Sequence, residues 1–303
     1  MSATTLNRTR AALLAVLGYA ALIGFTDNFV RLVAEEVGLW QFHALRTGMA
    51  VVLFALGARV FGLALAPKRW APMIARSAIH AASMLVYFGC LAFLTVAQTA
   101  AGLFTAPIFV LLFSRFLFGH ALGPVRIAAV ALGFVGVVLV LQPGSQSPLG
   151  WASLFPVAAG ALYALGNLAT REWCEGESAA SLTLGFFVAL GVAGLAGMGA
   201  LALWQPEVSP GAAGFILRGW VTPSGTVLFW TFVQALGSTL AVSLMVRAYQ
   251  LADASRVSVF EYVILPISAL WSWILWGQTI AALAVLGMGL IIAAGAMIAL
   301  RNR

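Results

Sequence analysis

The sequence predicts an all-α integral membrane protein with ten transmembrane helices. Two observations predict this class. The chain of 303 residues is 62% hydrophobic and 8% charged, with a mean hydropathy of +1.02, whereas soluble domains carry about a quarter charged residues. Long apolar segments also recur from end to end, each near the roughly 20 residues that a helix needs to cross a bilayer. Helices are expected because they satisfy their own backbone groups in lipid.

The ten expected spans are joined by short connections. In chain order they are 11–33, 41–61, 73–94, 98–118, 124–141, 151–171, 181–203, 226–250, 255–276 and 280–300. The longest connection, Trp204–Gly225, is too small for a catalytic domain, and the chain has no P-loop and no dinucleotide-binding glycine turn. Cys90 and Cys174 fall near opposite membrane faces, so a disulfide is not expected. We therefore predict no enzyme activity, no catalytic residue, no metal and no cofactor.

The charge distribution predicts orientation. The chain has 16 Lys and Arg against 9 Asp and Glu, a net charge of +7, but the basic residues lie at helix ends and form no patch for nucleic acid. With a cytoplasmic N-terminus, all basic residues except Arg31, Arg46 and Arg218 fall toward the cytoplasm. Both termini are therefore predicted inside, in a bacterial inner membrane. The first segment continues into Asp27, past signal-peptide length, so it is read as a span.

An internal repeat divides the chain. Gln98–His120 resembles Asp253–Gln278, with Pro107 aligned to Pro266 and the closing Gly119-His120 to Gly277-Gln278 after a one-residue gap. The unit is five spans, 1–145 and 146–303, with Gln142–Gly150 as linker. An odd number of spans inverts the second copy, and inverted repeats are an architecture of secondary transporters. Each proline favours a bend or gate, although a repeat also persists for structural reasons alone.

The chain resembles the EamA-type transporters of the drug/metabolite transporter superfamily, and within it the amino-acid exporters of the YddG type. The resemblance covers nearly the whole chain. It rests on the span-2 arginine in FHALRTGMA (Arg46), the proline-centred fourth span of each half, and the glycine-rich closing helices ALGFVGVVLV and AVLGMGLIIAAGAMI. Many family members have Gly-Glu where this chain has Gly119-His120 and Gly277-Gln278. The resemblance implies a ten-helix basket, a central cavity lined by spans 1, 3, 4, 6, 8 and 9, alternating access, and export.

Polar side chains inside spans normally face protein or water, because a central charge costs at least about 2.5–3.5 kcal/mol. In span 3, His80, Met84 and Tyr87 share one helical face, which suits a ligand with a flat or sulfur-containing side chain. Span 6 offers Tyr163 and Asn167, and span 8 offers Trp230 and Gln234. The structural alternatives are a histidine bonded to backbone, an asparagine joining helices and a tryptophan anchored at the interface.

Acidic side chains inside the spans are candidates for substrate binding, coupling and gating. Glu261 lies about two turns into span 9, roughly 10 Å deep, and its alternative is pairing with Arg46 or a helix end. Asp27 and Asn28 lie two-thirds of the way across span 1 and suit an outer gate, the alternative being an Asp27–Arg31 pair. Pro107 and Pro266 complete the gating candidates.

The leading functional hypothesis is a secondary transporter of small amphipathic metabolites, most of all amino acids, including aromatic ones and methionine. The alternative is a nucleotide-like or cofactor substrate such as S-adenosylmethionine or riboflavin, known for relatives in the superfamily. A channel and a membrane scaffold are the alternatives from other classes. Proton coupling and passive facilitation are both open. The expected partners are a small-molecule substrate and the lipid bilayer, and the glycine-rich spans 5 and 10 are candidates for close packing and for homodimer contacts.

Overall fold

A computed structural model describes residues 3–142, 150–277 and 280–300, with the side chains of all of these except residues 3–6, 31, 212 and 300. Its regular elements in these ranges are all helices. Ten helical segments are long and apolar enough to cross a membrane: Asn7–Glu36, Leu39–Phe61, Trp70–Cys90, Val96–Phe116, Pro124–Leu141, Trp151–Glu172, Ala179–Trp204, Gly225–Leu251, Ala254–Trp276 and Ala282–Ala299. The predicted fold class is confirmed. Most of the predicted linker, and Gln278, lie outside the described residues.

Several spans consist of more than one helical element. The first contains α1 (Ala3–Thr26), the 3-10 turn η1 (Asp27–Phe29) and α2 (Val30–Glu36). The unbroken spans are α3 (Leu39–Phe61), α4 (Trp70–Cys90), α7 (Pro124–Leu141), α9 (Ala179–Trp204), α10 (Gly225–Leu251) and α13 (Ala282–Leu300). A short turn, η2 (Trp151–Ser153), precedes α8 (Leu154–Glu172), and η3 (Gly211–Gly214) lies in the connection before α10.

Both proline-centred spans are interrupted in the middle. Span 4 divides into α5 (Val96–Leu103) and α6 (Ala106–Phe116), and span 9 into α11 (Ala254–Glu261) and α12 (Ile264–Trp276). Backbone bonds at the breaks join residues three apart, as from Thr105 N to Gly102 O at 3.1 Å and from Val263 N to Phe260 O at 3.1 Å, which is the tighter 3-10 pattern. Pro107 and Pro266 follow directly within the new helices, where a missing N–H is tolerated.

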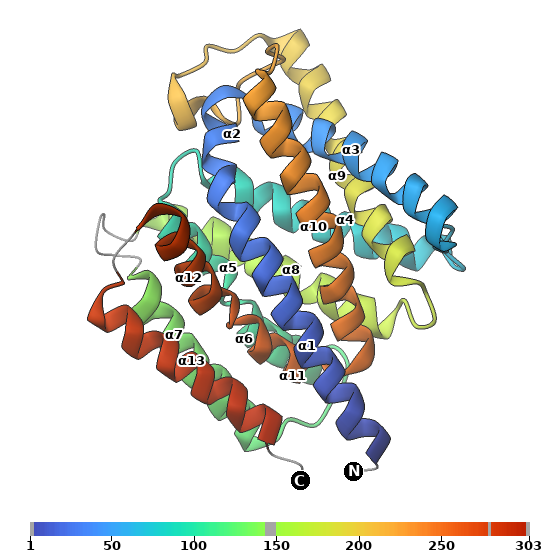
Figure 1. Cartoon of the computed structure of the whole chain (residues 1–303), viewed down its shortest axis with the longest axis vertical. Helices are drawn as coiled ribbons and strands as arrows, with labels where there is room; N and C mark the ends of the chain where they lie inside the picture. Colours follow the sequence, from blue (N-terminus) through green and yellow to red (C-terminus); the bar gives the residue numbers. More distant parts are fainter. Residues whose placement is uncertain (1–2, 143–149, 278–279, 301–303) are drawn as a thin grey trace.

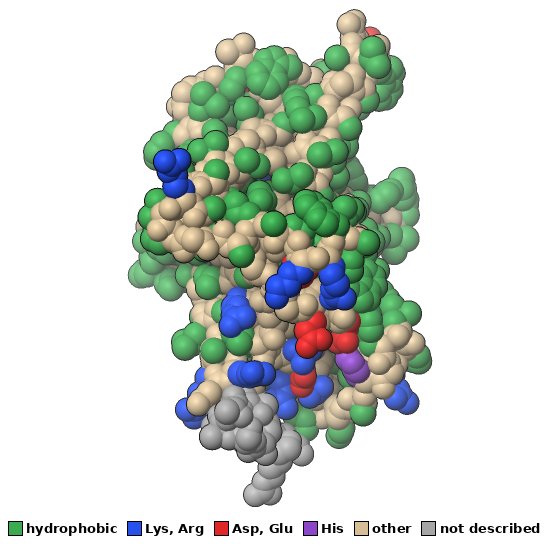
Figure 2. Space-filling model, turned by 90° about the vertical axis from the view of Figure 1, so that its right-hand side faces the viewer, with side chains coloured by type: hydrophobic (Ala, Val, Ile, Leu, Met, Phe, Trp, Pro, Cys, Tyr) green, Lys and Arg blue, Asp and Glu red, His purple; other side chains and the backbone are tan. Residues whose placement is uncertain are grey.

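The helices pack in recurring pairs. α1 lies against α10 and α12, α8 lies against α4, α5 and α6, α3 packs on α9, and α7 packs on α13. Figure 1 shows α7 and α13 side by side, and both chain termini at the same end of the molecule. Hydrophobic side chains cover much of the face shown in Figure 2, while charged side chains gather toward one end of it. An apolar surface of this kind suits lipid.

Glycine allows α7 and α13 to approach closely. A Cβ on Gly136 would lie 2.7 Å from the Gly287 carbonyl oxygen, and one on Gly287 would lie 2.6 Å from the Gly136 carbonyl oxygen. The close packing expected of spans 5 and 10 is therefore confirmed within the chain. Their outer faces carry exposed Val135 and Ile292, and a homodimer through those faces stays a prediction.

Candidate functional site

Four helices bring an acid, an amide, an imidazole and phenols together in the membrane interior, and we call this group the inner polar cluster (His80, Tyr163, Asn167, Tyr249 and Glu261). The hydroxyl of Tyr249 donates to Glu261 Oε1, and Asn167 Nδ2 donates to the same oxygen at 3.5 Å. His80 Nε2 lies 3.0 Å from Asn167 Oδ1. A continuous line of polar contacts thus connects α10, α11, α8 and α4.

Glu261 occupies the last residue of α11, directly before the helix break. Glu261 is 7% exposed, and a phenol and an amide donate hydrogen bonds to its carboxylate. Arg46, the partner that the sequence offered as an alternative, contacts His43 and three phenyl rings instead. That alternative for Glu261 is wrong, because Arg46 lies in a different group of residues.

A glycine makes room for the imidazole of the inner polar cluster. A Cβ on Gly166 would lie 2.2 Å from Nδ1 of His80, so even a methyl group at this position displaces the ring. The ring of Tyr163 meets the His80 ring edge to face, with centroids 5.5 Å apart. Tyr163, together with Tyr19 of α1, also lies within interaction range of the Glu261 carboxylate. His80 is therefore held by α8 on two sides.

The second group of polar residues lies nearer the opposite end of the spans, and we call it the outer polar cluster (Asp27, Asn28, His43, Arg46 and Gln234). Gln234 Nε2 donates to Asp27 Oδ1 at 3.0 Å. Asn28 Nδ2 donates to the Gly24 carbonyl at 2.6 Å, and its Oδ1 accepts from Ser272 at 3.0 Å. These contacts tie the end of α1 to α10 and α12. The Arg31 side chain is not described, so the Asp27–Arg31 alternative stays a prediction.

Trp230 has an aromatic partner within the protein. Its ring stacks on Phe29, with centroids 3.6 Å apart and planes 9° from parallel, and Phe29 also meets Trp276 edge to face at 5.9 Å. Trp230 thus packs inside the bundle, whereas an interfacial anchor would face lipid. An apolar layer that includes Val33, Val37, Phe42, Phe88 and Phe215 lies at the same end of the molecule.

The predicted stripe on span 3 runs between the two clusters. His80 joins the inner polar cluster, whereas Tyr87 lies within electrostatic range of Asp27 in the outer one. Met84, between them, is half-buried. It packs against the apolar layer described above and against a second group of buried apolar residues that includes Phe54 and Phe187. Met84, Tyr87, Tyr163 and Trp230 keep accessible surface, and Asp27 is exposed. The predicted central cavity along this stripe stays a prediction.

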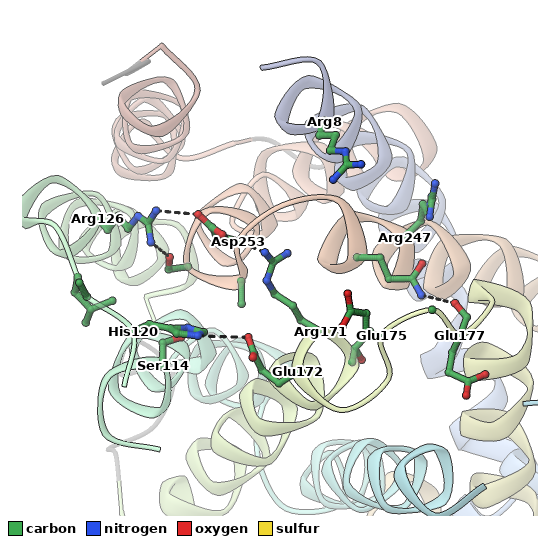
Figure 3. A pocket seen from close by; sticks show the side chains of 17 residues that line it. Arg8, Ser114, His120, Arg126, Arg171, Glu172, Glu175, Glu177, Arg247 and Asp253 are labelled. Atoms are coloured by element: carbon green, nitrogen blue, oxygen red, sulfur yellow. Dashed lines mark hydrogen bonds and ion pairs between the residues drawn. The ribbon is translucent and has the colours of Figure 1, made fainter. Parts of the chain in front are cut away.

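A charged pocket of about 790 Å³ opens at the end of the molecule where the termini lie (Figure 3). Asp253 at the start of α11 accepts from Arg126 at 2.9 Å and from Arg171 at 3.3 Å. Arg126 also donates to Ser255, and Arg171 to the Ala252 carbonyl. Glu261 lies eight residues further along α11, about 12 Å along a helix. The charge distribution of the sequence predicts this end of the molecule to be cytoplasmic, and that orientation stays a prediction.

Sequence reasoning missed Tyr249 and His43, which belong to these clusters, and Tyr19, which lies within interaction range of Glu261. Each is a polar side chain in an apolar span, which is itself a signal. Tyr249, however, lies only two residues from the end of α10, where a tyrosine is typical of a membrane interface. His43 lies three residues before Arg46 on α3, a spacing that places the two side chains on one face.

Comparisons with known proteins agree with this architecture. The EamA-like transporter family matches residues 10–142. The chain is 31% identical over 229 residues to a riboflavin transporter of Rhizobium johnstonii, covering 76% of this chain and 70% of that protein. It is 23% identical to the pseudopaline exporter of Pseudomonas aeruginosa, covering 91% and 92%, and 23% identical to an S-adenosylmethionine uptake transporter of Rickettsia felis, covering 64% and 62%. A solved crystal structure superposes with a TM-score of 0.76 at 18% identity, covering 97% of this chain and 98% of the other.

Proposed function

The chain belongs to the EamA-like transporter family, and we propose that it is a secondary transporter that carries a small ring-bearing metabolite by alternating access between two inverted five-helix halves. The observation that carries this proposal is the inner polar cluster. It places a carboxylate, an amide, an imidazole and phenols from four helices deep in a bilayer-spanning bundle. Such groups are expensive in a membrane and mark substrate and ion pathways.

The packing of the helices supports the two halves, 1–145 and 146–303. If each span is replaced by the matching span of the other half, the contact between α1 and α10 becomes the contact between α8 and α4. The contact between α1 and α12 becomes the contact between α8 and α6 in the same way, and all four contacts are present. The pairs α3–α9 and α7–α13 map onto themselves. Both breaks fall just before the aligned prolines, Pro107 and Pro266. We propose these breaks as hinges, because the loss of continuous helical bonding lets each half-helix tilt.

The substrate that we propose first is riboflavin or a similar cofactor. The matched proteins include a riboflavin transporter and an S-adenosylmethionine uptake transporter, which favours the cofactor alternative over the amino acids expected from the sequence. Tyr87, Tyr163 and Trp230 offer aromatic faces for a flat ring. Asn167 and Gln234 offer amides that both donate and accept, as a heterocycle edge requires. Amino acids remain the second candidate, because an acid and an arginine lie close together in the outer polar cluster.

Location and coupling complete the proposal. We place the protein in a bacterial inner membrane with both termini, and the charged pocket, on the cytoplasmic side. Glu261 is the proposed coupling residue, because it is an intramembrane carboxylate in contact with a phenol and an amide. Asp27 and Asn28 are the proposed outer gate, since they join the end of α1 to α10 and α12. Alternating access itself has no required direction, and one matched protein is named an exporter and another an uptake transporter.

We expect purified protein in proteoliposomes to take up labelled riboflavin with saturable kinetics. Unlabelled S-adenosylmethionine, L-tryptophan, L-phenylalanine and L-methionine, added one at a time, will rank the substrate classes by competition. Protein-free vesicles are the control for leakage. Riboflavin flux that saturates supports the proposal. If riboflavin is not carried, saturable uptake of a labelled amino acid moves the substrate to the second candidate. Vesicles that show no saturable flux of labelled riboflavin or of any labelled member of the panel contradict the transport function.

A further inference from the structure

Arg46 is a buried cation whose surroundings are mostly apolar. The side chain is 4% exposed, and its guanidinium carbon lies 5.0, 5.4 and 5.6 Å from the ring centroids of Phe42, Phe187 and Phe88. Its Nη2 lies 3.5 Å from His43 Nδ1, the limit of a hydrogen bond, and its Nε has no partner among the described residues. Aromatic faces offset part of the desolvation of a cation, but a buried guanidinium normally binds a carboxylate or phosphate.

The nearest acid is close to Arg46 without pairing to it. Asp27 and Arg46 interact electrostatically, yet within the described part of the chain no carboxylate oxygen lies within 4.0 Å of the Arg46 guanidinium nitrogens. The Asp27 side chain is exposed, so there is open space beside it. Gln234 fixes one Asp27 oxygen at 3.0 Å. The two opposite charges thus interact without forming an ion pair.

Acceptor oxygens without partners lie on α10, at Gln234 and one turn before it. In the described part of the chain, Gln234 Oε1 and the hydroxyl of Thr231, one turn earlier on α10, have no hydrogen-bond partner although both are buried. A buried polar atom left unpaired is unfavourable. A ligand ammonium has three N–H donors, so it can satisfy Asp27 and one of these oxygens together.

We propose that Asp27 and Arg46 form a binding site for the zwitterionic head of an α-amino acid. The carboxylate of Asp27 and Oε1 of Gln234 accept hydrogen bonds from the ligand ammonium, and the Arg46 guanidinium donates to the ligand carboxylate. The ligand class is a free aromatic amino acid or a metabolite that ends in an α-amino-carboxylate. The Trp230–Phe29 stack, one turn from Gln234 on α10, lies where it can flank the ring end. This assignment rests on the proposed transport function and develops its second substrate candidate.

The competing interpretation is that Asp27 serves the proposed outer gate alone, by closing on Arg46 in another state of the transport cycle, and binds no substrate group. A gate needs both charges but does not bind the ammonium or the carboxylate of the substrate. A binding site makes each charge responsible for one substrate group. The two interpretations therefore differ in selectivity, even where they agree on loss of flux.

The experiment uses three probes that share an indole ring: L-tryptophan, tryptamine, which lacks the carboxylate, and indole-3-propionate, which lacks the ammonium. Each competes with labelled L-tryptophan for binding to the purified full-length protein. We expect each analogue to bind at least tenfold more weakly than tryptophan, about 1.4 kcal/mol per tenfold. In Asp27→Asn the preference for tryptophan over indole-3-propionate should fall to within about threefold, with the preference over tryptamine kept. In Arg46→Gln the preference for tryptophan over tryptamine should fall to within about threefold, with the preference over indole-3-propionate kept.

Matched variants separate selectivity from folding. Arg76→Gln removes another buried arginine, whose Nε and Nη1 already bond Thr170 and the Leu182 carbonyl, and it should lower stability without changing the preference ratios. If Arg46→Gln fails to fold, Arg46→Lys takes its place. Lysine keeps the positive charge, so this variant should keep part of the preference for tryptophan over tryptamine. Reciprocal loss of selectivity supports the binding site. A wild-type protein that does not distinguish the three probes, or variants that weaken all three equally, overturns it.

The readouts also separate this inference from the transport function. Saturable riboflavin flux that tryptophan never inhibits, combined with no tryptophan binding, overturns the zwitterion site while transport stands. Tryptophan binding with the expected selectivity, but no flux of any probe in vesicles, supports the site and removes the transport function.

Discussion

Replacing Glu261 by glutamine is expected to lower substrate flux at least tenfold and to remove the response of flux to an imposed pH gradient. Glutamine keeps the size of the side chain and one oxygen that can accept from Tyr249 and Asn167. It carries no charge and exchanges no proton, so a loss of flux can be attributed to the missing carboxylate. The measurement is flux into proteoliposomes with and without a pH gradient, for wild type and variant side by side.

A second buried glutamate provides the control for this substitution. Glu177 is 6% exposed, and its two carboxylate oxygens accept the backbone N–H groups of Lys68 and Arg69 at 2.8 Å. Glu177→Gln should weaken this loop contact and lower the melting temperature, while the response to the pH gradient is kept. If Glu261→Gln instead shows wild-type flux with an unchanged pH response, Glu261 has a structural role only.

Adding a single methyl group at Gly166 is expected to reduce flux at least tenfold. The new Cβ would lie 2.2 Å from Nδ1 of His80, so the imidazole must leave its place and its contact with Asn167. Overpacking of this kind also destabilises a protein by about 1–3 kcal/mol. The measurements are flux and the apparent melting temperature of the purified Gly166→Ala variant. Gly48→Ala is the matched control, because its Cβ would have nothing within 4 Å.

A double variant distinguishes lost packing from lost chemistry. Removing the imidazole in Gly166→Ala/His80→Ala makes space for the methyl group, so the melting temperature should recover toward the wild-type value. Flux should stay low, because the polar connection from Glu261 through Asn167 to His80 is still broken. Recovery of flux together with stability would show that His80 fills space and takes no part in transport.

The membrane spans were predictable because bilayer thickness and backbone hydrogen bonding act on each segment separately. Every predicted end lies within four residues of the observed one, and the glycine-rich spans 5 and 10 do pack closely. The proline positions indicated a bend. They did not show that the helix stops before Pro107 and Pro266, because a proline inside an apolar helix can also produce only a kink.

The candidate site was predictable one helix at a time. Periodicity placed His80, Met84 and Tyr87 on one face of span 3. In the structure this stripe runs from the inner polar cluster, which contains His80, toward Asp27 of the outer one. Periodicity could not show which residues of different helices contact one another. The partners of Glu261 come from spans 8 and 6, and the three rings around Arg46 come from spans 2, 3 and 7. Such partners depend on helix rotation and depth, which a hydropathy pattern does not encode.

Alternating access by a family transporter is tested most directly by solute counterflow. Vesicles that contain the purified protein are loaded with unlabelled riboflavin and diluted into a trace of labelled riboflavin. A carrier that exposes its site to one side at a time accumulates label transiently above the equilibrium level, and we expect this overshoot for the wild type and a reduced one for Gly166→Ala. If riboflavin and the amino acids of the competition panel, each tested in this way, give only a monotonic approach to equilibrium, or no entry beyond protein-free vesicles, the protein is not such a carrier.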